Sequence, residues 1–101
     1  MTFRISIQKR AESQISEAYS WYEQKQTHLG AEFLMAIEEQ LTQIEANPYL
    51  FQIKYKNLYL AKTRKFPYGL FYFIDHDKII VLAVFHLSRN PGLWKKLKKE
   101  G

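Results

Sequence analysis

Basic side chains cluster near one predicted turn, and they are the groups in this chain best suited to chemistry. Lys62, Arg64 and Lys65 lie at or just before a turn at residues 66–69, and Arg89 follows the last predicted strand. Cations that converge on one place bind phosphate groups and stabilise negative charge that develops during a reaction. The same spacing also arises when long basic side chains on a solvated strand guard the edge of a sheet. The spacing leaves both interpretations open.

A histidine and two tyrosines lie in the same part of the chain. His86 ends the last predicted strand, where it can act as a general acid or base or simply hydrogen-bond to a loop carbonyl. Tyr68 and Tyr72 are the aromatic residues that we expect to be exposed, and exposed rings between lysines can stack on unpaired bases. The i, i+2 spacing of the aromatic residues is also that of a buried strand face, which would make most of them core residues.

The sequence predicts neither a metal site nor a cofactor. His28, His76 and His86 lack the spacing of metal ligands, and Asp75 and Asp77 are typical of a hairpin loop. There is no cysteine, which excludes disulfides and thiolate metal sites and fits a reducing compartment. A glycine-rich phosphate loop and a nucleophile elbow are also missing from the sequence.

The charge is distributed unevenly along the chain. Residues 1–50 carry four basic side chains against seven glutamates, a net charge of −3, whereas residues 51–101 carry eleven against three acidic ones, a net charge of +8. Such asymmetry indicates an acidic partner for the second half, either nucleic acid or an acidic protein segment. Solubility alone is the other explanation of the surplus lysines.

Length and hydropathy indicate one domain in a cytoplasmic protein. A chain of 101 residues is expected to form a single domain, residues 1–101. Its longest apolar run, residues 79–85, is far shorter than the ~20 residues needed to cross a bilayer. The N-terminal residues show no apolar secretory signal, so we expect no membrane association.

The first half of the chain predicts a strand and two helices. Residues 2–7 alternate apolar and polar side chains, as in a strand with one buried face, and their terminal position suggests a sheet edge. Residues 9–26 and 31–46 each carry an apolar stripe at steps of three and four, which predicts two helices. Gly30 marks the reversal between them, so the helices form an antiparallel hairpin that must pack on a sheet. The dipeptide Asn47-Pro48 ends the second helix.

The second half predicts three more strands. Residues 49–57 are interpreted as a loop, and strands are expected over residues 58–65, 70–74 and 79–86. A basic helix or tail follows from Pro91. The predicted order β-α-α-β-β-β defines an α+β domain with a helical hairpin packed on an antiparallel sheet. The strand ends that carry the basic residues and His86 would then share one rim.

An ordered set of short motifs resembles the RelE/ParE toxin family of bacterial type II toxin–antitoxin systems. Each motif is weak alone, but together they follow the family's order along nearly the whole chain. The matching segments are Trp21-Tyr22-Glu23, LGAEFL at 29–34, Asn47-Pro48, RKFPYGLFY at 64–72, IIVLAVFH at 79–86, and Arg89-Asn90-Pro91 with Trp94. The fold that this resemblance implies is the one predicted above.

The resemblance implies one of two activities and a protein partner. Some members of the family cleave mRNA on the ribosome with basic side chains on the sheet, others inhibit DNA gyrase, and a cognate antitoxin silences both. The nucleases carry an arginine where Gly69 stands and a second lysine where Leu60 stands. The ending of the chain is closer to the ParE branch, the plasmid stabilisation proteins, although Trp94 stands where a tyrosine is often found.

We therefore predict a growth-inhibiting toxin that targets DNA gyrase and is neutralised by a cognate antitoxin. A ribosome-dependent mRNA endoribonuclease and a non-toxic antitoxin-binding module remain the alternatives. The candidate catalytic residues, if there is catalysis, are Arg64, His86 and Arg89. The candidate target-binding residues are Lys62, Lys65, Tyr68, Tyr72 and Trp94.

Overall fold

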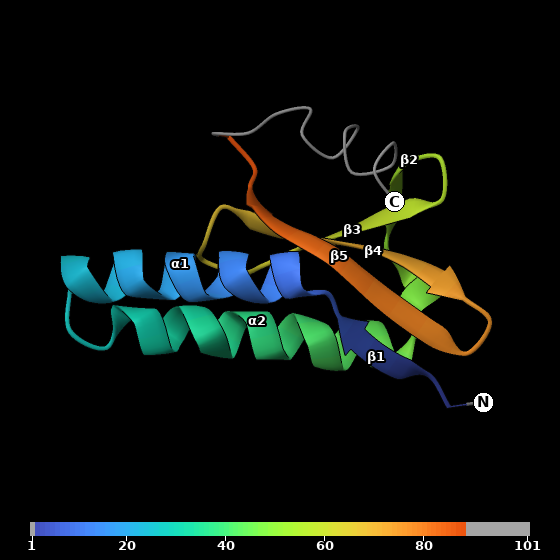
Figure 1. The fold of residues 1–101 in the computed structure, drawn as a ribbon, viewed down its shortest axis with the longest axis horizontal. Helices are drawn as coiled ribbons and strands as arrows, with labels where there is room; N and C mark the ends of the chain where they lie inside the picture. Colours follow the sequence, from blue (N-terminus) through green and yellow to red (C-terminus); the bar gives the residue numbers. More distant parts are fainter. Residues whose placement is uncertain (1, 89–101) are drawn as a thin grey trace.

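A helical hairpin packs against one face of a five-stranded sheet in the computed structural model, which describes residues 2–88 (Figure 1). The α+β class and the order of the predicted elements are confirmed. The elements are β1 (Arg4–Ile7), α1 (Lys9–Lys25), α2 (Leu29–Ala46), the 3₁₀ helix η1 (Pro48–Leu50), β2 (Gln52–Tyr55), β3 (Leu58–Lys62), β4 (Tyr68–Asp75) and β5 (Lys78–His86).

The sheet has the order β1-β5-β4-β3-β2, so the first strand lies at an edge as predicted. Strands β2 to β5 are antiparallel to their neighbours, but β1 runs parallel to β5, with Arg4 opposite Lys78 and Ile7 opposite Val81. The sheet is therefore mixed rather than wholly antiparallel. Beyond the end of β1, the side-chain oxygen of Gln14 in α1 accepts the amide of Val84 at 2.7 Å, which ties the helix to β5.

Two predictions about the segments around β3 were wrong. The predicted loop at residues 49–57 contains the last two residues of η1 and the edge strand β2. The predicted strand 58–65 ends at Lys62, because Thr63 closes the following turn. Its hydroxyl donates to the carbonyl of Phe66 at 2.8 Å, and its amide donates to that of Tyr68 at 2.9 Å. The left-handed backbone of Lys65 (φ 71°) completes the turn.

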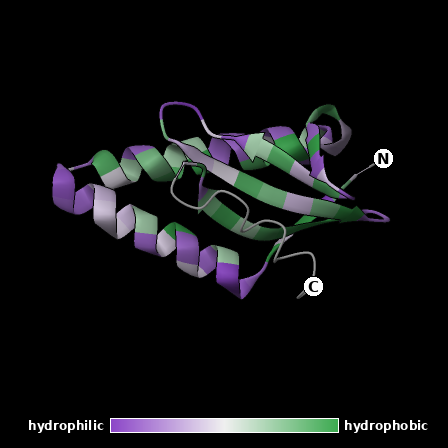
Figure 2. Cartoon of the chain, turned by 90° about the horizontal axis from the view of Figure 1, so that it is seen from above, coloured by the Kyte–Doolittle hydropathy of each residue, from purple (hydrophilic) through white to green (hydrophobic). Residues whose placement is uncertain are grey.

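Both faces of the sheet carry apolar side chains, and much of the strands is coloured as hydrophobic in Figure 2. The helix-side core contains Ala11, Ala18, Tyr22, Phe33, Ile37, Ile44, Ala61, Phe66, Tyr68, Leu70, Tyr72, Ile79, Val81 and Val84. The second core, on the opposite face, contains Leu58, Leu60, Phe71, Ala83 and Phe85. The predicted helix stripes thus contribute to the first core.

A bulge explains why the sequence of β5 shows no alternation. Phe71 lies opposite Ala83 while the next residue, Tyr72, lies opposite Val81, so β5 has one extra residue at Leu82. The extra residue places Val81 and Val84 on the same face of the sheet, although three positions separate them.

The expected exposure of Tyr68 and Tyr72 was wrong. Tyr68 is 7% exposed and Tyr72 is fully buried, because the helices cover that face of β4. The hydroxyl of Tyr72 donates to the carbonyl of Pro48 at 2.6 Å, and its ring stacks on that of Tyr59 at 5.2 Å. Tyr72 therefore connects η1 to β4 through this hydrogen bond.

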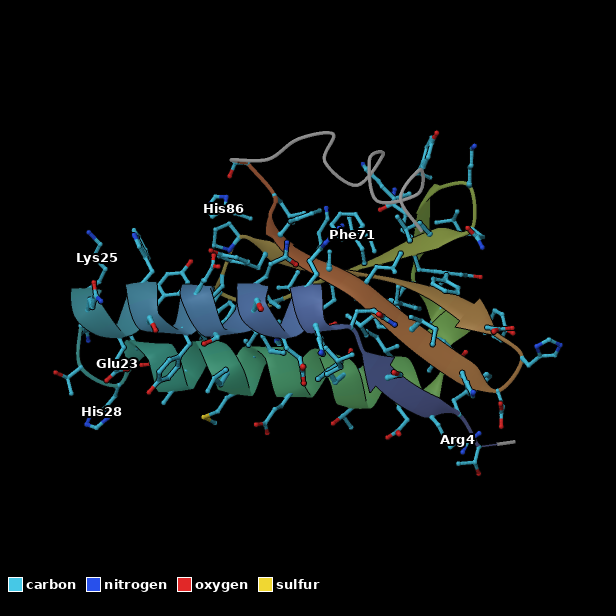
Figure 3. The ribbon with its side chains drawn as sticks, in the orientation of Figure 1. Arg4, Glu23, Lys25, His28, Phe71 and His86 are labelled. Atoms are coloured by element: carbon cyan, nitrogen blue, oxygen red, sulfur yellow. The ribbon has the colours of Figure 1, made fainter. Side chains whose placement is uncertain are left out.

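Glu23 caps the start of α2 from the end of α1, at the tip of the hairpin (Figure 3). Its carboxylate accepts the amides of His28 and Gly30, both at 2.9 Å. The cap residue of α2, His28, adopts left-handed backbone (φ 73°) and makes no side-chain cap of its own. The amide of His28, followed by that of Gly30, lowers the pKa of Glu23 below its usual value of 4.5.

Glu23→Gln is expected to remove a pH-dependent part of the stability. A carboxyl group whose pKa is lowered by folding stabilises the fold above its unfolded pKa, and this contribution disappears as pH falls through the folded pKa. The variant should thus be less stable than the wild type at pH 7, and the difference should narrow below about pH 4.5. Urea denaturation at several pH values in this range measures the unfolding free energies of the variant and the wild type. A difference between them that stays constant with pH would contradict the capping role.

Candidate functional site

The basic rim is the end of the sheet where β3 and β5 finish and β4 begins. Lys62 pairs with Gly69, Gly69 with Phe85, and Tyr68 with His86, so the three strand ends meet at one edge as expected. We use the name basic rim for Lys62, Arg64, Lys65 and His86 with the turn at residues 63–67. Neither helix in the described part of the chain has the length and apolar character needed to span a bilayer.

His86 lies at the rim on the helix side of the sheet (Figure 3). Its ring meets the ring of Tyr68 edge-on, with the centroids 5.2 Å apart. The amide of Ser88 donates to Nδ1 of His86 at 3.3 Å. A neutral ring that accepts at Nδ1 carries its proton on Nε2. The residue that follows β5 by two positions thus contacts the His86 ring at the rim.

Lys62 lies on the opposite face of the sheet from His86. It follows Leu58 and Leu60 at steps of two, and those residues belong to the second core. His86 follows Val84 at the same step, and Val84 belongs to the helix-side core. The ends of β3 and β5 therefore meet at the rim, but the side chains of Lys62 and His86 lie on opposite faces of the sheet.

Arg64 and Lys65 line a groove of about 570 Å³ between the turn and α2. Glu32, Met35, Ala36 and Glu39 of α2, together with Phe66, form the rest of its wall. A guanidinium nitrogen of Arg64 lies 3.7 Å from a carboxylate oxygen of Glu39, and both side chains are exposed. Exposed pairs of this kind contribute about 0–1 kcal/mol, so Arg64 is held only weakly and can exchange partners.

Sequence reasoning missed the acidic wall of this groove. Glu32 and Glu39 are seven residues apart and therefore share one face of α2. That spacing was the available signal, but nothing in it shows that the face meets the turn after β3.

Two predicted site residues, Arg89 and Trp94, lie outside the described residues. Within residues 2–88, no three histidine, aspartate or glutamate side chains gather as they would around a metal ion. Tyr72 lies inside the sheet rather than on the rim, whereas the buried ring of Tyr68 contacts that of His86.

Two solved structures resemble this fold. Among curated proteins nothing matches. A solved structure described as the chromosomal ParDE toxin–antitoxin system from P. aeruginosa superposes with a TM-score of 0.69 at 11% identity, over 84% of this chain and 96% of that chain. The free E. coli toxin RelE, as a double mutant, superposes with a TM-score of 0.65 at 13% identity, over 99% and 98%. These likenesses establish a shared fold.

The family comparison covers most of the chain. Residues 5–91 match the family described as the ParE toxin of the type II toxin–antitoxin system parDE. The match extends from β1 through the helical hairpin and the sheet to just beyond the basic rim. The chain therefore belongs to the ParE toxin family of type II toxin–antitoxin systems.

Proposed function

We propose that this ParE-family toxin inhibits growth by binding DNA gyrase, and that a cognate antitoxin neutralises it. The observation that carries the choice of gyrase over mRNA is the packing of Leu60 against Gly69. These are the two positions at which the nuclease branch would place cations. Leu60 is buried in the second core, and a Cβ at Gly69 would clash with Cδ1 of Leu60 and lie 3.0 Å from Cδ2 of Leu87.

The separation of the rim's polar groups also supports a binding role. Cleavage of RNA needs a base and phosphate-binding cations around one reacting centre, within hydrogen-bond reach of it. Lys62 lies on the opposite face of the sheet from His86, so the sheet separates these two groups. Exposed cations arranged in this way fit recognition of an acidic protein or nucleic-acid surface.

The test is inhibition of purified gyrase by the purified chain. We expect slower supercoiling or trapped cleaved DNA, and Arg64→Gln should weaken the effect at least about threefold because rim charges steer association. Arg4→Gln is the matched control. Arg4 is also an exposed arginine in a weak ion pair, 3.8 Å from Asp77, but it lies opposite Lys78, at the other end of β5 from His86 (Figure 3). Unchanged supercoiling at high toxin excess would reject the proposal.

A ribosome-dependent endoribonuclease is the second candidate. Arg64, Lys65 and His86 all lie at the basic rim, where the cations would bind a phosphate and the histidine would transfer a proton. This function predicts codon-positioned cuts in translated mRNA that disappear in Arg64→Ala and Arg89→Ala. Intact transcripts during expression of the toxin would exclude it.

The antitoxin is expected to be an acidic protein encoded beside this chain. A non-toxic antitoxin-binding module is the third candidate, and it predicts harmless expression in the absence of that neighbour. Growth arrest on expression of this chain alone, relieved by the neighbouring gene, would support a toxin and exclude the module.

A further inference from the structure

The groove between α2 and the turn at residues 63–67 has two walls of opposite charge. Glu32 and Glu39 line it from α2, whereas Arg64 and Lys65 line it from the turn. All four residues are exposed, so their charges are accessible to a molecule in the groove. A bound molecule therefore meets carboxylates on one side and cations on the other.

Apolar side chains complete the lining of this groove. Met35 is 69% exposed, and with Ala36 it stands between the two glutamates along one face of α2. On the turn side, the ring of Phe66 is 9% exposed and meets the buried rings of Tyr22 and Phe33 edge-on, at 4.9 and 5.4 Å. These contacts hold the turn to the helix-side core, so the groove is formed before a partner binds, which lowers the entropy lost on binding.

An ion pair crosses the groove from one wall to the other. A guanidinium nitrogen of Arg64 lies 3.7 Å from a carboxylate oxygen of Glu39, and 78% and 47% of the two side chains are exposed. Because an exposed pair contributes only about 0–1 kcal/mol, a partner can replace it at little cost. The partner must then supply a carboxylate to Arg64 and a cation to Glu39, or one of them loses its counter-charge.

The unlike charges of the two walls select the kind of partner. The phosphates of a nucleic acid would face Glu32 and Glu39 along one side of the groove, and the carboxylates would repel them. A segment of the acidic antitoxin expected above would meet the same repulsion. A protein segment that carries an apolar side chain between a basic and an acidic one matches both walls and the apolar lining.

We propose that this groove recognises gyrase by binding a segment of the gyrase surface in which an apolar side chain lies between a basic and an acidic one. The apolar side chain packs on Met35, the basic one faces the glutamates of α2, and the acidic one replaces Glu39 as the partner of Arg64. This inference rests on the proposed function, because it names the surface that meets the target and the chemistry of the segment that it binds.

Glu32→Lys in the full chain tests the acidic wall. Its binding to purified gyrase without DNA, followed by biolayer interferometry, should be at least about threefold weaker than that of the wild type, because a cation then faces the basic side chain of the partner. If the toxin used only its positive charge, the same substitution would strengthen binding to an acidic target, so the direction of the change is decisive. The matched control is Glu38→Lys, at an exposed position of α2 outside the groove, which should change the affinity by less than about twofold.

Reversal of the ion pair tests the polarity of the groove. The double variant Arg64→Glu with Glu39→Arg keeps the net charge and allows the pair to form in the opposite direction. We expect it to bind gyrase at least about tenfold more weakly, because like charges then meet on both walls. Met35→Ser should weaken binding at least about threefold, and Leu50→Ser, at an exposed apolar position outside the groove, is its control.

Supercoiling assays with the same variants separate this inference from the proposed function. If the wild type inhibits gyrase and both Glu32→Lys and the double variant inhibit it equally well or better, the inference fails and the proposed function stands. If these variants lose affinity only for the purified product of the neighbouring gene, the groove is the antitoxin's site and the inference fails in the same way. If the wild type leaves gyrase uninhibited, the proposed function fails and the inference fails with it.

Circular dichroism shows whether each variant folds. Glu32 lies in the first turn of α2, where a lysine is unfavourable to the helix. If Glu32→Lys does not fold, Glu32→Gln takes its place, because it removes the charge and keeps the size of the side chain. The expected change has the same direction, a weaker binding of gyrase, and unchanged or tighter binding by Glu32→Gln would overturn the inference.

Discussion

Replacing Tyr72 with alanine is expected to lower the free energy of unfolding by about 3–5 kcal/mol. The ring is fully buried between the hairpin and the sheet, stacks on Tyr59 with the planes 10° apart, and meets the ring of Phe51 at 6.3 Å. Its removal leaves a cavity and an unpaired carbonyl at Pro48. Urea denaturation followed by circular dichroism measures the loss.

Tyr72→Phe separates the hydrogen bond from the packing. Because the phenol donates to Pro48 in a buried site, its loss should lower the unfolding free energy by about 1–2 kcal/mol. Burial, with a smaller contribution from Tyr59, raises the pKa of Tyr72 above its usual value of 10.0. The wild type should therefore lose stability as pH rises above that value, and Tyr72→Phe should lack this loss. Tyr49→Phe, at an exposed position, should stay within about 0.5 kcal/mol, and equal losses at both positions would contradict the assignment.

Gly30→Ala is expected to destabilise the fold by about 2 kcal/mol, although alanine favours helices. A Cβ at this position would lie 2.7 Å from the backbone carbonyl oxygen of Tyr19 and 2.8 Å from a carbon of its ring. The carbonyl cannot move without displacing α1, and overpacking of this kind costs about 1–3 kcal/mol. The widened hairpin would also strain the bond from the Gly30 amide to Glu23, while helix propensity returns up to about 1 kcal/mol.

Chemical denaturation of Gly30→Ala beside Glu38→Ala checks this value. Glu38 is exposed on the same helix, so its replacement should change the unfolding free energy by less than about 0.5 kcal/mol. A gain in stability for Gly30→Ala would show that propensity outweighs the close approach of the helices.

The sequence predicted elements correctly where a single buried face gives the apolar residues one regular spacing. The apolar stripes of α1 and α2 were read correctly because each helix has one buried face, and Asn47-Pro48 marked the end of α2. Strand β2 was missed because it is a four-residue edge strand with mostly exposed side chains, which leaves little apolar alternation to detect. The role of Gly30 was also misread. The left-handed residue at the reversal is His28, and Gly30 is needed for the approach of α1, a contact that no local pattern contains.

The meeting of the strand ends at the basic rim was predictable, but the face of the sheet on which each side chain lies was not. A β-meander brings the ends of alternate strands to one edge, so the meeting of Lys62 with the region of His86 followed from the order of the strands. Which face each side chain occupies depends on the bulge at Leu82, and a one-residue shift reverses every later position. The burial of Tyr68 and Tyr72 could not be inferred for a similar reason. Both faces of β4 are covered, so polar and apolar alternation carries no information about exposure.

The parallel pairing of β1 with β5 has a consequence for synthesis on the ribosome. The helical hairpin is formed by neighbouring segments and can assemble while the chain is still emerging. Arg4, however, pairs with Lys78, and Ile7 with Val81, so β1 has no strand to join until the chain has been made as far as β5. An incomplete translation product that lacks β5 would have neither a closed sheet nor the strand that α1 contacts through Gln14. The cell therefore meets a folded toxin only after β5 has been synthesised.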